Sequence, residues 1–302
     1  MKVIVQFSGG KDSLATLIWA INKYGKEKVE AVFCDTKWEH EITYKHIAEV
    51  IEKLQVKLTV LSSKKYLSFL DMVEKKKRFP STKARFCTEE LKTKPMIDYV
   101  LQQTEHLILL QGIRKDESES RSKMEKQCSY FKYYTQPYGV DKKGKNKFHI
   151  YRKKEVLEWR SKYSDDVLRP VFEWTGQEVI NYILDNGVKP NPLYYMGMSR
   201  VGCMPCIMAK LGEVKEISNR FPDVIEKVKQ AEITLNTSMM PPGKIPDKFC
   251  SKKATNKKGE VKAFPTITDV VKYVKRKDAQ QSIFEEDKNN NHRCMSFYGI
   301  CE

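Results

Sequence analysis

A short run near the start of the chain combines the groups that can hold a phosphate, Ser8-Gly9-Gly10-Lys11-Asp12-Ser13. Paired glycines let a backbone curl around an anion without a Cβ clash, while lysine adds a mobile positive charge and serine adds hydroxyls. If a helix begins at this turn, its N-terminal N–H groups and the positive end of its dipole point at the same place. The run therefore predicts a phosphate-binding loop.

The flanking residues predict the strand and the helix that would position this loop. Residues 3–7 are β-rich, and apolar residues then recur at helical spacing until Gly25, at Leu14, Leu17, Ile18 and Ile21. The spacing is not that of a Walker loop, which needs Gly, four residues and then Gly-Lys-Ser/Thr. A lone Gly-Gly pair would indicate only an ordinary strand-to-helix turn, whereas all six residues here fit a nucleotide loop.

Ser-Gly-Gly-x-Asp-Ser resembles the pyrophosphate loop (PP-loop) of the adenine nucleotide alpha-hydrolase-like enzymes. Those enzymes split ATP between its α and β phosphates or bind a related sulfonucleotide. The resemblance implies an adenine nucleotide at residues 8–13, either ATP or phosphoadenosine phosphosulfate (PAPS), with Mg²⁺. It also implies that Lys11 and Asp12 take part in catalysis.

A second predicted strand, residues 29–34, ends at Asp35 and Thr36. In nucleotide-binding α/β units a carboxylate at this point commonly meets a ribose hydroxyl, so Asp35 is a predicted nucleotide contact. The pattern Asp-Thr-x-Trp-Glu is similar to the same point in PAPS reductases. Lys37 stands where that family usually has glycine, which predicts a different turn there.

The pattern Arg-x-Cys-Thr-x-x-Leu-Lys-x-x-Pro begins at Arg85 and contains Cys87 and Lys92. It resembles a Cys-Cys-x-x-Leu-Lys-x-x-Pro stretch of PAPS and adenosine phosphosulfate (APS) reductases, and resembles more closely the DNA phosphorothioation sulfurtransferases. Positive charge from Arg85 and Lys92 would lower the pKa of Cys87 and favour its thiolate. We therefore predict that Cys87 is the reactive thiol and that the two cations bind the substrate anion. A buried, inert cysteine is the alternative.

The most apolar stretch, residues 106–111, predicts a central parallel strand. It runs into Gly112 and the pattern Gly-x-Arg-x-x-x-Ser-x-x-Arg, a signature shared with both families. Arginine offers a planar fork that matches phosphate or sulfate oxygens, and ligands of open α/β sheets bind at the carboxyl ends of strands. We therefore predict that Gly112 contacts the nucleotide and that Arg114 and Arg121 bind the substrate anion.

Half of the eight cysteines fall in a pattern typical of metal sites. Cys203 and Cys206 form Cys-x-x-Cys, which lets two thiolates hold one metal or cluster, and Cys294 and Cys301 supply two more ligands. The set suits a [4Fe–4S] cluster or zinc. Iron–sulfur is favoured by resemblance, because cluster-bearing sulfonucleotide reductases carry ligands at the positions of Cys87, Cys203 and Cys206. Two alternatives stay open: Cys87 replaces Cys301 as a ligand, or Cys203 and Cys206 form a metal-free redox dithiol.

The formal charge of +16 favours polyanionic partners, DNA or RNA first, with a generally basic surface as the alternative. Residues 122–154 interleave lysines with tyrosines, which suits nucleic-acid binding or an ordered flap on the sheet. No apolar run approaches the ~20 residues of a membrane helix. With no signal peptide before the first strand, the sequence predicts a cytoplasmic protein with no membrane partner.

These patterns predict an open, mostly parallel α/β sheet of the PP-loop type in residues 1–176. Residues 177–302 are predicted to form an α-rich C-terminal cap that carries the cysteines. The resemblance covers about residues 1–210 and implies an enzyme that transfers sulfur to a nucleic acid. ATP would adenylate an oxygen with loss of pyrophosphate, and a persulfide on Cys87 would deliver sulfur obtained from a cysteine desulfurase or a thioredoxin-like donor. The alternatives are a PAPS or APS reductase and a non-catalytic nucleotide- or nucleic-acid-binding protein.

Overall fold

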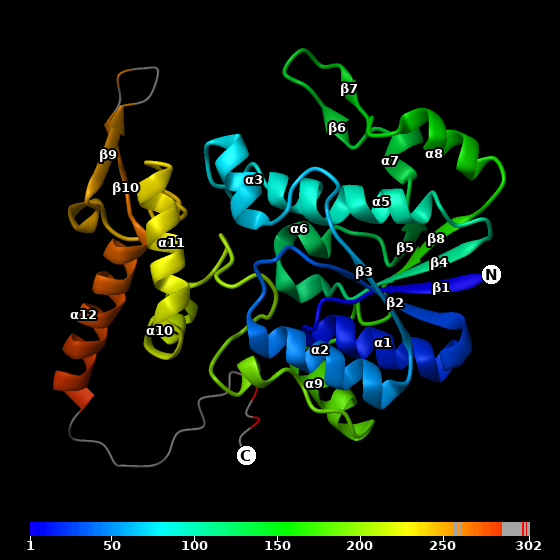
Figure 1. Cartoon of the computed structure of the whole chain (residues 1–302), viewed down its shortest axis with the longest axis horizontal. Helices are drawn as coiled ribbons and strands as arrows, with labels where there is room; N and C mark the ends of the chain where they lie inside the picture. The colour runs from blue at the N-terminus through cyan, green and yellow to red at the C-terminus, as the bar shows by residue number, and fades with distance from the viewer. Residues whose placement is uncertain (256–258, 260, 286–297, 299, 301–302) are drawn as a thin grey trace. The chain divides into compact units, whose positions relative to one another are not determined.

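The computed structural model describes the chain except residues 256–258, 260, 286–297, 299 and 301–302 (Figure 1). The chain divides into two compact units, each made of separate segments. The sheet unit comprises residues 1–35, 41–63 and 91–192, and the cysteine unit comprises residues 36–40, 64–90 and 193–302.

The sheet unit is built on one six-stranded sheet in the order β3-β2-β1-β4-β8-β5. Its strands are β1 (Lys2–Gln6), β2 (Val29–Cys34), β3 (Lys57–Leu61), β4 (Leu107–Gln111), β5 (Gln127–Ser129) and β8 (Asp165–Leu168). All neighbouring pairs are parallel except β5, which runs antiparallel to β8 at one edge. The predicted open, mostly parallel sheet is therefore confirmed.

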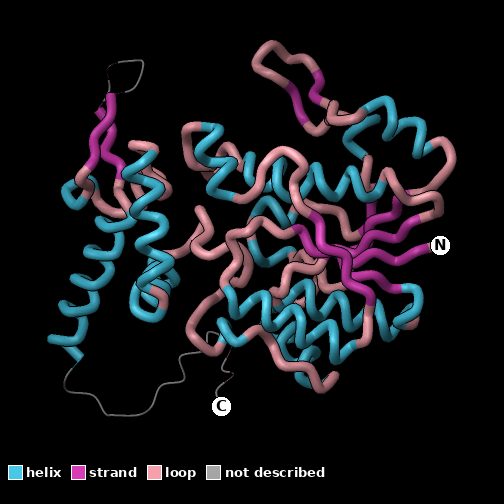
Figure 2. The backbone as a smooth tube through the Cα atoms, in the orientation of Figure 1, coloured by secondary structure: helices cyan, strands magenta, loops and turns pink. Residues whose placement is uncertain are grey.

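Helices cover both faces of this sheet (Figures 1 and 2). One face carries α1 (Lys11–Tyr24), α2 (Glu41–Leu54) and α9 (Gly176–Asp185), and the other carries α5 (Lys94–Val100), α7 (Lys132–Thr135) and α8 (Lys153–Arg160). Because side chains alternate along a strand, Val3 and Val5 of β1 join the first core while Ile4 joins the second. The central strands are thus apolar on both faces, as buried parallel strands must be.

The shorter elements of the sheet unit lie in its connections. They are the 3-10 helices at Lys26–Lys28 and Lys115–Glu117, α6 (Glu119–Ser122), and the two-stranded hairpin β6 (Gly139–Val140) and β7 (Asn146–Lys147). A π-helical turn at Glu89–Thr93 precedes α5 in the chain. α9 packs against α1, where Asn22 Nδ2 donates to Tyr182 Oη at 3.2 Å and to Asn186 Oδ1 at 3.0 Å.

The cysteine unit is mainly helical. It contains α3 (Phe69–Lys76), α4 (Phe86–Thr88), α10 (Leu211–Arg220), α11 (Pro222–Thr234), α12 (Ile267–Glu285), and 3-10 turns at Pro192–Tyr194 and Asp247–Phe249. It also contains an antiparallel hairpin, β9 (Lys252–Thr255) and β10 (Val261–Phe264), which sequence reasoning did not anticipate. The predicted domain boundary between residues 176 and 177 stays a prediction. No helix in the described part of the chain has the length and apolarity needed to cross a membrane.

Candidate functional site

The backbone of the loop between β1 and α1 packs closely against α2. Gly9 has φ +72°, in the left-handed region that favours glycine, and a Cβ built there would lie 3.0 Å from Ile47 Cγ1 and Thr43 Cγ2. Gly10 caps α1 in an extended conformation, without any side-chain cap. The start of α1 is therefore bare backbone, which is the arrangement that binds phosphate groups at helix N-termini.

Two serines hold the shape of this loop. Ser13 Oγ accepts from the backbone N–H of Ser8 at 3.1 Å, donates to the carbonyl of Gly10 at 2.9 Å and lies 3.2 Å from Ser8 Oγ. The amide of the fully buried Asn191 donates to the carbonyl of Gly9 at 3.3 Å. Sequence reasoning assigned Asn191 no role, although it opens the run Asn-Pro-Leu-Tyr.

The chain leaving β4 passes very close to the first turn of α1. A Cβ built on Gly112 would lie 2.5 Å from the carbonyl carbon of Asp12, 2.6 Å from its oxygen and 2.6 Å from the backbone nitrogen of Ser13. All three are backbone atoms, so no side chain can rotate away to make room. Gly112 is therefore required for the contact between the end of β4 and the start of α1.

Charged side chains reinforce this contact. Lys11 Nζ, which is buried, lies 3.2 Å from Asp12 Oδ2, and Arg114 Nε donates to Asp12 Oδ1. Arg114 also pairs through Nη1 with Asp116. Burial alone would lower the pKa of Arg114, but the carboxylates of Asp12 and Asp116 raise it above its ordinary value. Its fork is thus charged and held by two carboxylates.

The predicted nucleotide contacts gather at one edge of the sheet, because β1, β2 and β4 are parallel neighbours. The phosphate loop follows β1, Asp35 follows β2 and Gly112 follows β4. Asp35 is buried, and its Oδ1 accepts from Tyr44 Oη at 2.7 Å. Arg121, in α6, forms an ion pair with Glu117. The roles of these residues toward nucleotide and substrate anion stay predictions.

In the cysteine unit, Cys203 lies against the segment that follows Asp35 in the chain. Cys203 Sγ lies 3.6 Å from Glu39 Oε1 and 3.6 Å from Thr36 Oγ1, and an antiparallel β-bridge joins Glu39 to Cys203. Trp38 fixes this contact, because its Nε1 donates to the carbonyl of Pro205 at 3.0 Å and its carbonyl accepts from Met204 at 2.8 Å. The Asp-Thr-x-Trp-Glu motif is the sequence signal that points to this contact.

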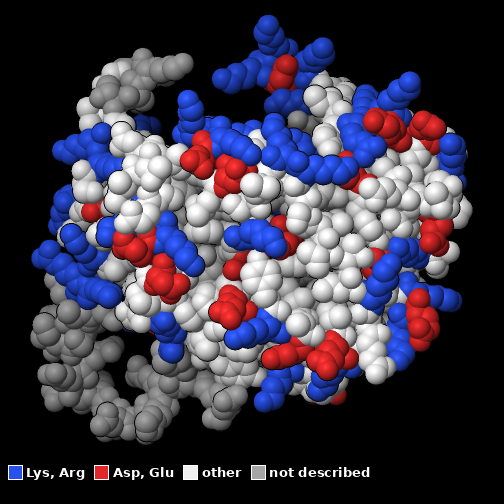
Figure 3. All heavy atoms as spheres, in the orientation of Figure 1, with Lys and Arg blue, Asp and Glu red and all other residues white. Residues whose placement is uncertain are grey.

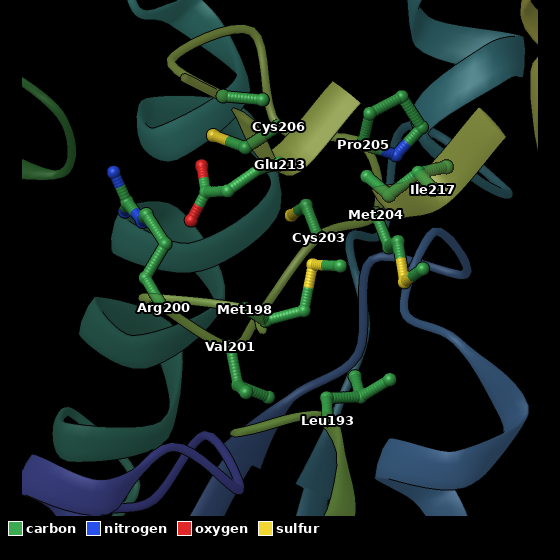
Figure 4. A pocket seen from close by; sticks show the side chains of 12 residues that line it. Leu193, Met198, Arg200, Val201, Cys203, Met204, Pro205, Cys206, Glu213 and Ile217 are labelled. Atoms are coloured by element: carbon green, nitrogen blue, oxygen red, sulfur yellow. The ribbon is translucent and has the colours of Figure 1, made fainter. Parts of the chain in front are cut away.

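Cys203 and Cys206 line a small cavity of about 20 Å³ (Figure 4). Such a volume holds a single small atom or molecule, of the size of one water. In the described residues no three His, Cys, Asp or Glu side chains are grouped so that they could hold a metal ion. Cys294 and Cys301 lie outside the described residues, so the four-cysteine site stays a prediction.

Cys87 lies in the short helix α4, close enough to Cys206 for their thiols to interact electrostatically. Burial raises the pKa of Cys87, and Cys206 raises it further, whereas a hydrogen bond with Thr88 and the charge of Arg85 oppose the rise without overcoming it. Arg85 therefore acts in the predicted direction, but burial outweighs its charge, so the predicted net lowering of this pKa is wrong. Lys92 belongs to the sheet unit, where its carbonyl accepts from Cys34 Sγ at 3.6 Å.

Comparisons with known proteins agree with the motifs. The family model of the phosphoadenosine phosphosulfate reductase domain matches residues 2–209. A 37.8 kDa protein of Escherichia phage 186 is 30% identical over 276 residues, which cover 76% of this chain and 74% of the phage protein. An adenosine 5'-phosphosulfate reductase of Mycolicibacterium smegmatis is 35% identical over 51 residues, which cover 17% of this chain and 22% of the reductase.

Among solved structures, the chain is similar to a PAPS reductase from Candida auris in complex with phosphate. It is 17% identical, with a TM-score of 0.43, and the match covers 66% of this chain and 80% of that one.

Proposed function

This chain belongs to the phosphoadenosine phosphosulfate reductase domain family, and on that premise we propose that it is an ATP-using sulfur-transfer enzyme that acts on a nucleic acid. The observation that carries the proposal is the N-terminus of α1, which has no side-chain cap. The backbone of Gly112 packs directly against the backbone of Asp12 and Ser13 in its first turn. An arrangement in which glycine keeps side chains away from a helix N-terminus suits the phosphates of a nucleotide. The adenine nucleotide would bind at Ser8–Ser13, with Asp35 toward its ribose.

The charged groups of the loop have distinct roles in this proposal. Lys11 would contact the phosphates and stabilise the negative charge that develops when pyrophosphate leaves. Asp12 holds Lys11 and Arg114 on either side of its carboxylate, so it positions both cations. The substrate anion would be bound by the four predicted cations, Arg85, Lys92, Arg114 and Arg121. ATP would adenylate an acceptor oxygen, and pyrophosphate would leave from its α phosphate.

Sulfur transfer would then take place at Cys87. A persulfide on Cys87 attacks the adenylated centre, the acceptor oxygen leaves with AMP, and a second thiol cleaves the remaining sulfur–sulfur bond. The terminal sulfur of a persulfide is the nucleophile, so the raised pKa of the Cys87 thiol itself does not prevent this step. A cysteine desulfurase or a thioredoxin-like protein is the class of donor that such a step requires.

The cysteine pair suits a soft metal centre in the same proposal. Cys203 and Cys206 present two thiols from one loop to a common cavity, and thiolates are ligands of both zinc and iron–sulfur clusters; the cavity of about 20 Å³ has the size for a single ion such as zinc. We propose that Cys294 and Cys301 complete the ligand set, with Cys87 as the competing third ligand because it neighbours Cys206. A bound centre would hold this loop in place next to Glu39.

A sulfonucleotide reductase is the second candidate, and the likeness to adenosine 5'-phosphosulfate reductases over about 50 residues favours it. In that reaction the loop binds PAPS or APS and a cysteine thiolate attacks its sulfur. The raised pKa of Cys87 disfavours a free thiolate there.

The candidates make different products. The purified full-length protein is incubated with ATP, cysteine and a cysteine desulfurase as sulfur donor, alone and with DNA or RNA, and separately with PAPS and a thiol reductant. Sulfur transfer predicts AMP and pyrophosphate in equal amounts, with more of both when nucleic acid is present. A reductase instead releases sulfite from PAPS and leaves ATP intact. A protein that binds nucleotide but forms none of these products is non-catalytic, and the proposal is then wrong.

A further inference from the structure

The hairpin β6–β7 and the aromatic residues at its base have no role in the nucleotide site. We infer that this basic arm, residues 138–149 with Tyr133, binds a single-stranded nucleic acid. The inference deepens the proposed function, because it assigns the nucleic acid a binding surface. It rests on the proposed function only for the biological reason for binding, whereas the arm lies wholly within the sheet unit. Figure 1 shows the arm projecting beyond α7 and α8, and Figure 3 shows Lys and Arg side chains gathered over it.

The tip of the arm carries positive charge that is not neutralised. Four exposed lysines lie on it, Lys142, Lys143, Lys145 and Lys147. Within the described residues none of them forms an ion pair, whereas other exposed lysines of this unit do, such as Lys123 with Glu119 and Lys162 with Glu158. A cluster of unpaired ammonium groups attracts phosphates and releases their counterions on binding.

The one acidic residue of the tip shapes the turn and leaves the lysines free for phosphates. Asp141 Oδ1 accepts from the backbone N–H groups of Lys143 at 2.7 Å and Lys145 at 2.9 Å. Gly144, with φ +78°, lets the chain reverse, and its N–H donates to the carbonyl of Asp141 at 3.1 Å. The carboxylate of Asp141 is thus occupied by backbone N–H groups and fixes the conformation of the turn. The lysine side chains of the tip extend from this turn into solvent.

An aromatic cluster lies at the base of the same arm. Ring centroids are 5.1 Å apart for Tyr138 and His149, 5.7 Å for Tyr133 and His149, and 6.1 Å for Tyr133 and Tyr138. Tyr133 is 41% exposed and Tyr138 is 50% exposed, so both present ring surface to solvent. Exposed aromatic rings beside lysines are the platform on which unpaired bases stack while lysines contact the phosphates.

Backbone hydrogen bonds join the lysine tip to the aromatic base as one element. Tyr138 N–H donates to the carbonyl of Lys147 at 3.0 Å, and His149 N–H donates to the carbonyl of Tyr133 at 2.9 Å. Below the cluster, the buried Tyr134 anchors it through a hydrogen bond of 2.7 Å to the carbonyl of Tyr151. Because bases in a duplex are already stacked on each other, this combination favours single strands over duplexes.

The test measures binding of the full-length protein to a fluorescently labelled oligonucleotide of about 12 nucleotides by anisotropy, over a range of salt concentrations. The arm variant changes Lys142, Lys143, Lys145 and Lys147 to Gln. Its matched control changes to Gln four other exposed lysines of the sheet unit for which the described residues show no ion pair, Lys23, Lys26, Lys28 and Lys189. Both variants lose the same net charge, so a difference between them reports the arm.

We expect the arm variant to bind at least about tenfold more weakly than the control and to reduce the slope of log affinity against log salt by about 3, since each single-strand phosphate contact contributes about 0.7. Tyr138→Ala should weaken binding about tenfold and leave that slope unchanged, because stacking releases no counterions. Equal affinity and equal slope in the arm and control variants would overturn the inference, as would equal affinity of the wild type for a duplex of the same length.

Pyrophosphate release from ATP without nucleic acid separates this inference from the proposed function. If the wild type binds the oligonucleotide through the arm but forms no pyrophosphate, the proposed function fails and the arm assignment stands. If pyrophosphate forms but the arm variant binds the oligonucleotide as the control does, the arm assignment fails alone.

Discussion

Arg114, which follows β4, donates from Nε to the carboxylate of Asp12 in the first turn of α1. The two residues are far apart in sequence, and their partly buried pairing links the segment that follows β4 to the first turn of α1 at the carboxyl edge of the sheet. Lys11 lies on the other oxygen of the same carboxylate. The arrangement explains how a loop containing two glycines keeps one conformation, and it makes the loop sensitive to changes outside the motif.

Replacing Arg114 with Gln should destabilise the sheet unit by about 2 kcal/mol, because it removes charged hydrogen bonds to Asp12 and Asp116, while Lys11 stays on the other oxygen of Asp12. Urea unfolding measures the change. Arg121→Gln is the control, since its pairing with Glu117 is part-exposed and should be worth less than about 1 kcal/mol. In a double-mutant cycle with Asp12→Asn, the effects of Arg114→Gln should be non-additive. Strict additivity would show that the pair is not coupled.

The lowered pKa of Glu30 in β2 leads us to expect that the free energy of unfolding falls in acid. Burial alone would raise its pKa, but hydrogen bonds from Lys2, Thr59 and Tyr99 lower it to about 2, against an ordinary value of 4.5. The ionised form is thus favoured in the folded state, so this contribution is fully present above about pH 4.5 and is lost as the pH falls toward about 2. The side chain is only 3% exposed, and the shift corresponds to about 3 kcal/mol.

Glu30→Gln checks this prediction. The free energy of unfolding of the variant should be lower than that of the wild type at neutral pH, and the difference should shrink as the pH falls below about 4.5. A difference that stays constant down to about pH 3 would mean that ionisation of Glu30 contributes nothing to stability.

His46 in α2 should make the free energy of unfolding depend on pH over a higher range than Glu30 does. Burial lowers its pKa to about 4 from an ordinary value of 6.5, and its Nε2 has no hydrogen-bond partner in the described structure. The folded state therefore keeps His46 neutral while the unfolded chain takes up a proton, so stability falls as the pH drops from about 6.5 to 4. His46→Leu should flatten the dependence of the unfolding free energy on pH in that range. An unchanged profile would contradict the assignment.

Much of the local structure of the candidate nucleotide site could be predicted from the sequence, because its parts are local. The strand, the glycine turn and the helix around residues 8–13 follow from apolar periodicity and glycine content, and Asp35 and Gly112 follow from the rule that parallel strands end at one edge. The pairing of Arg114 with Asp12 could not be predicted, because it depends on which strands are neighbours in the sheet. The antiparallel edge strand β5 is only three residues long and gives no periodic signal.

The chemistry of the cysteines was harder to predict, because it depends on burial and on distant neighbours. Arg85 lies two residues from Cys87 and suggested a lowered pKa, whereas burial raises that pKa in the folded chain. Glu39 and Cys203 meet although 164 residues separate them. No local pattern near Cys203 encodes that contact, and only the motif around Trp38 hints at it.

Cys87→Ser separates the two roles proposed for Cys87. The variant keeps the shape of the side chain and loses most of its nucleophilicity. If Cys87 carries sulfur, the variant should bind nucleotide and release pyrophosphate as the wild type does, but transfer no sulfur. If Cys87 is a metal ligand, the anaerobically purified variant should contain less iron or zinc. A variant normal in nucleotide binding, metal content and sulfur transfer would show that Cys87 is an inert buried cysteine.

Binding of an adenine nucleotide at the start of α1 is tested most directly by calorimetric titration of ATP and PAPS into three proteins: the wild type, Gly112→Ala and Gly212→Ala. Gly212 in α10 has open space where a Cβ would be, so its variant controls for the substitution itself. The wild type and Gly212→Ala should bind one or both nucleotides with equal affinity. Gly112→Ala should bind at least about 100-fold more weakly, a loss of about 2.7 kcal/mol, because the added Cβ displaces the backbone of Asp12 and Ser13. Unchanged affinity in a folded Gly112→Ala protein, or no binding of either nucleotide by the wild type, would contradict the assignment of this loop.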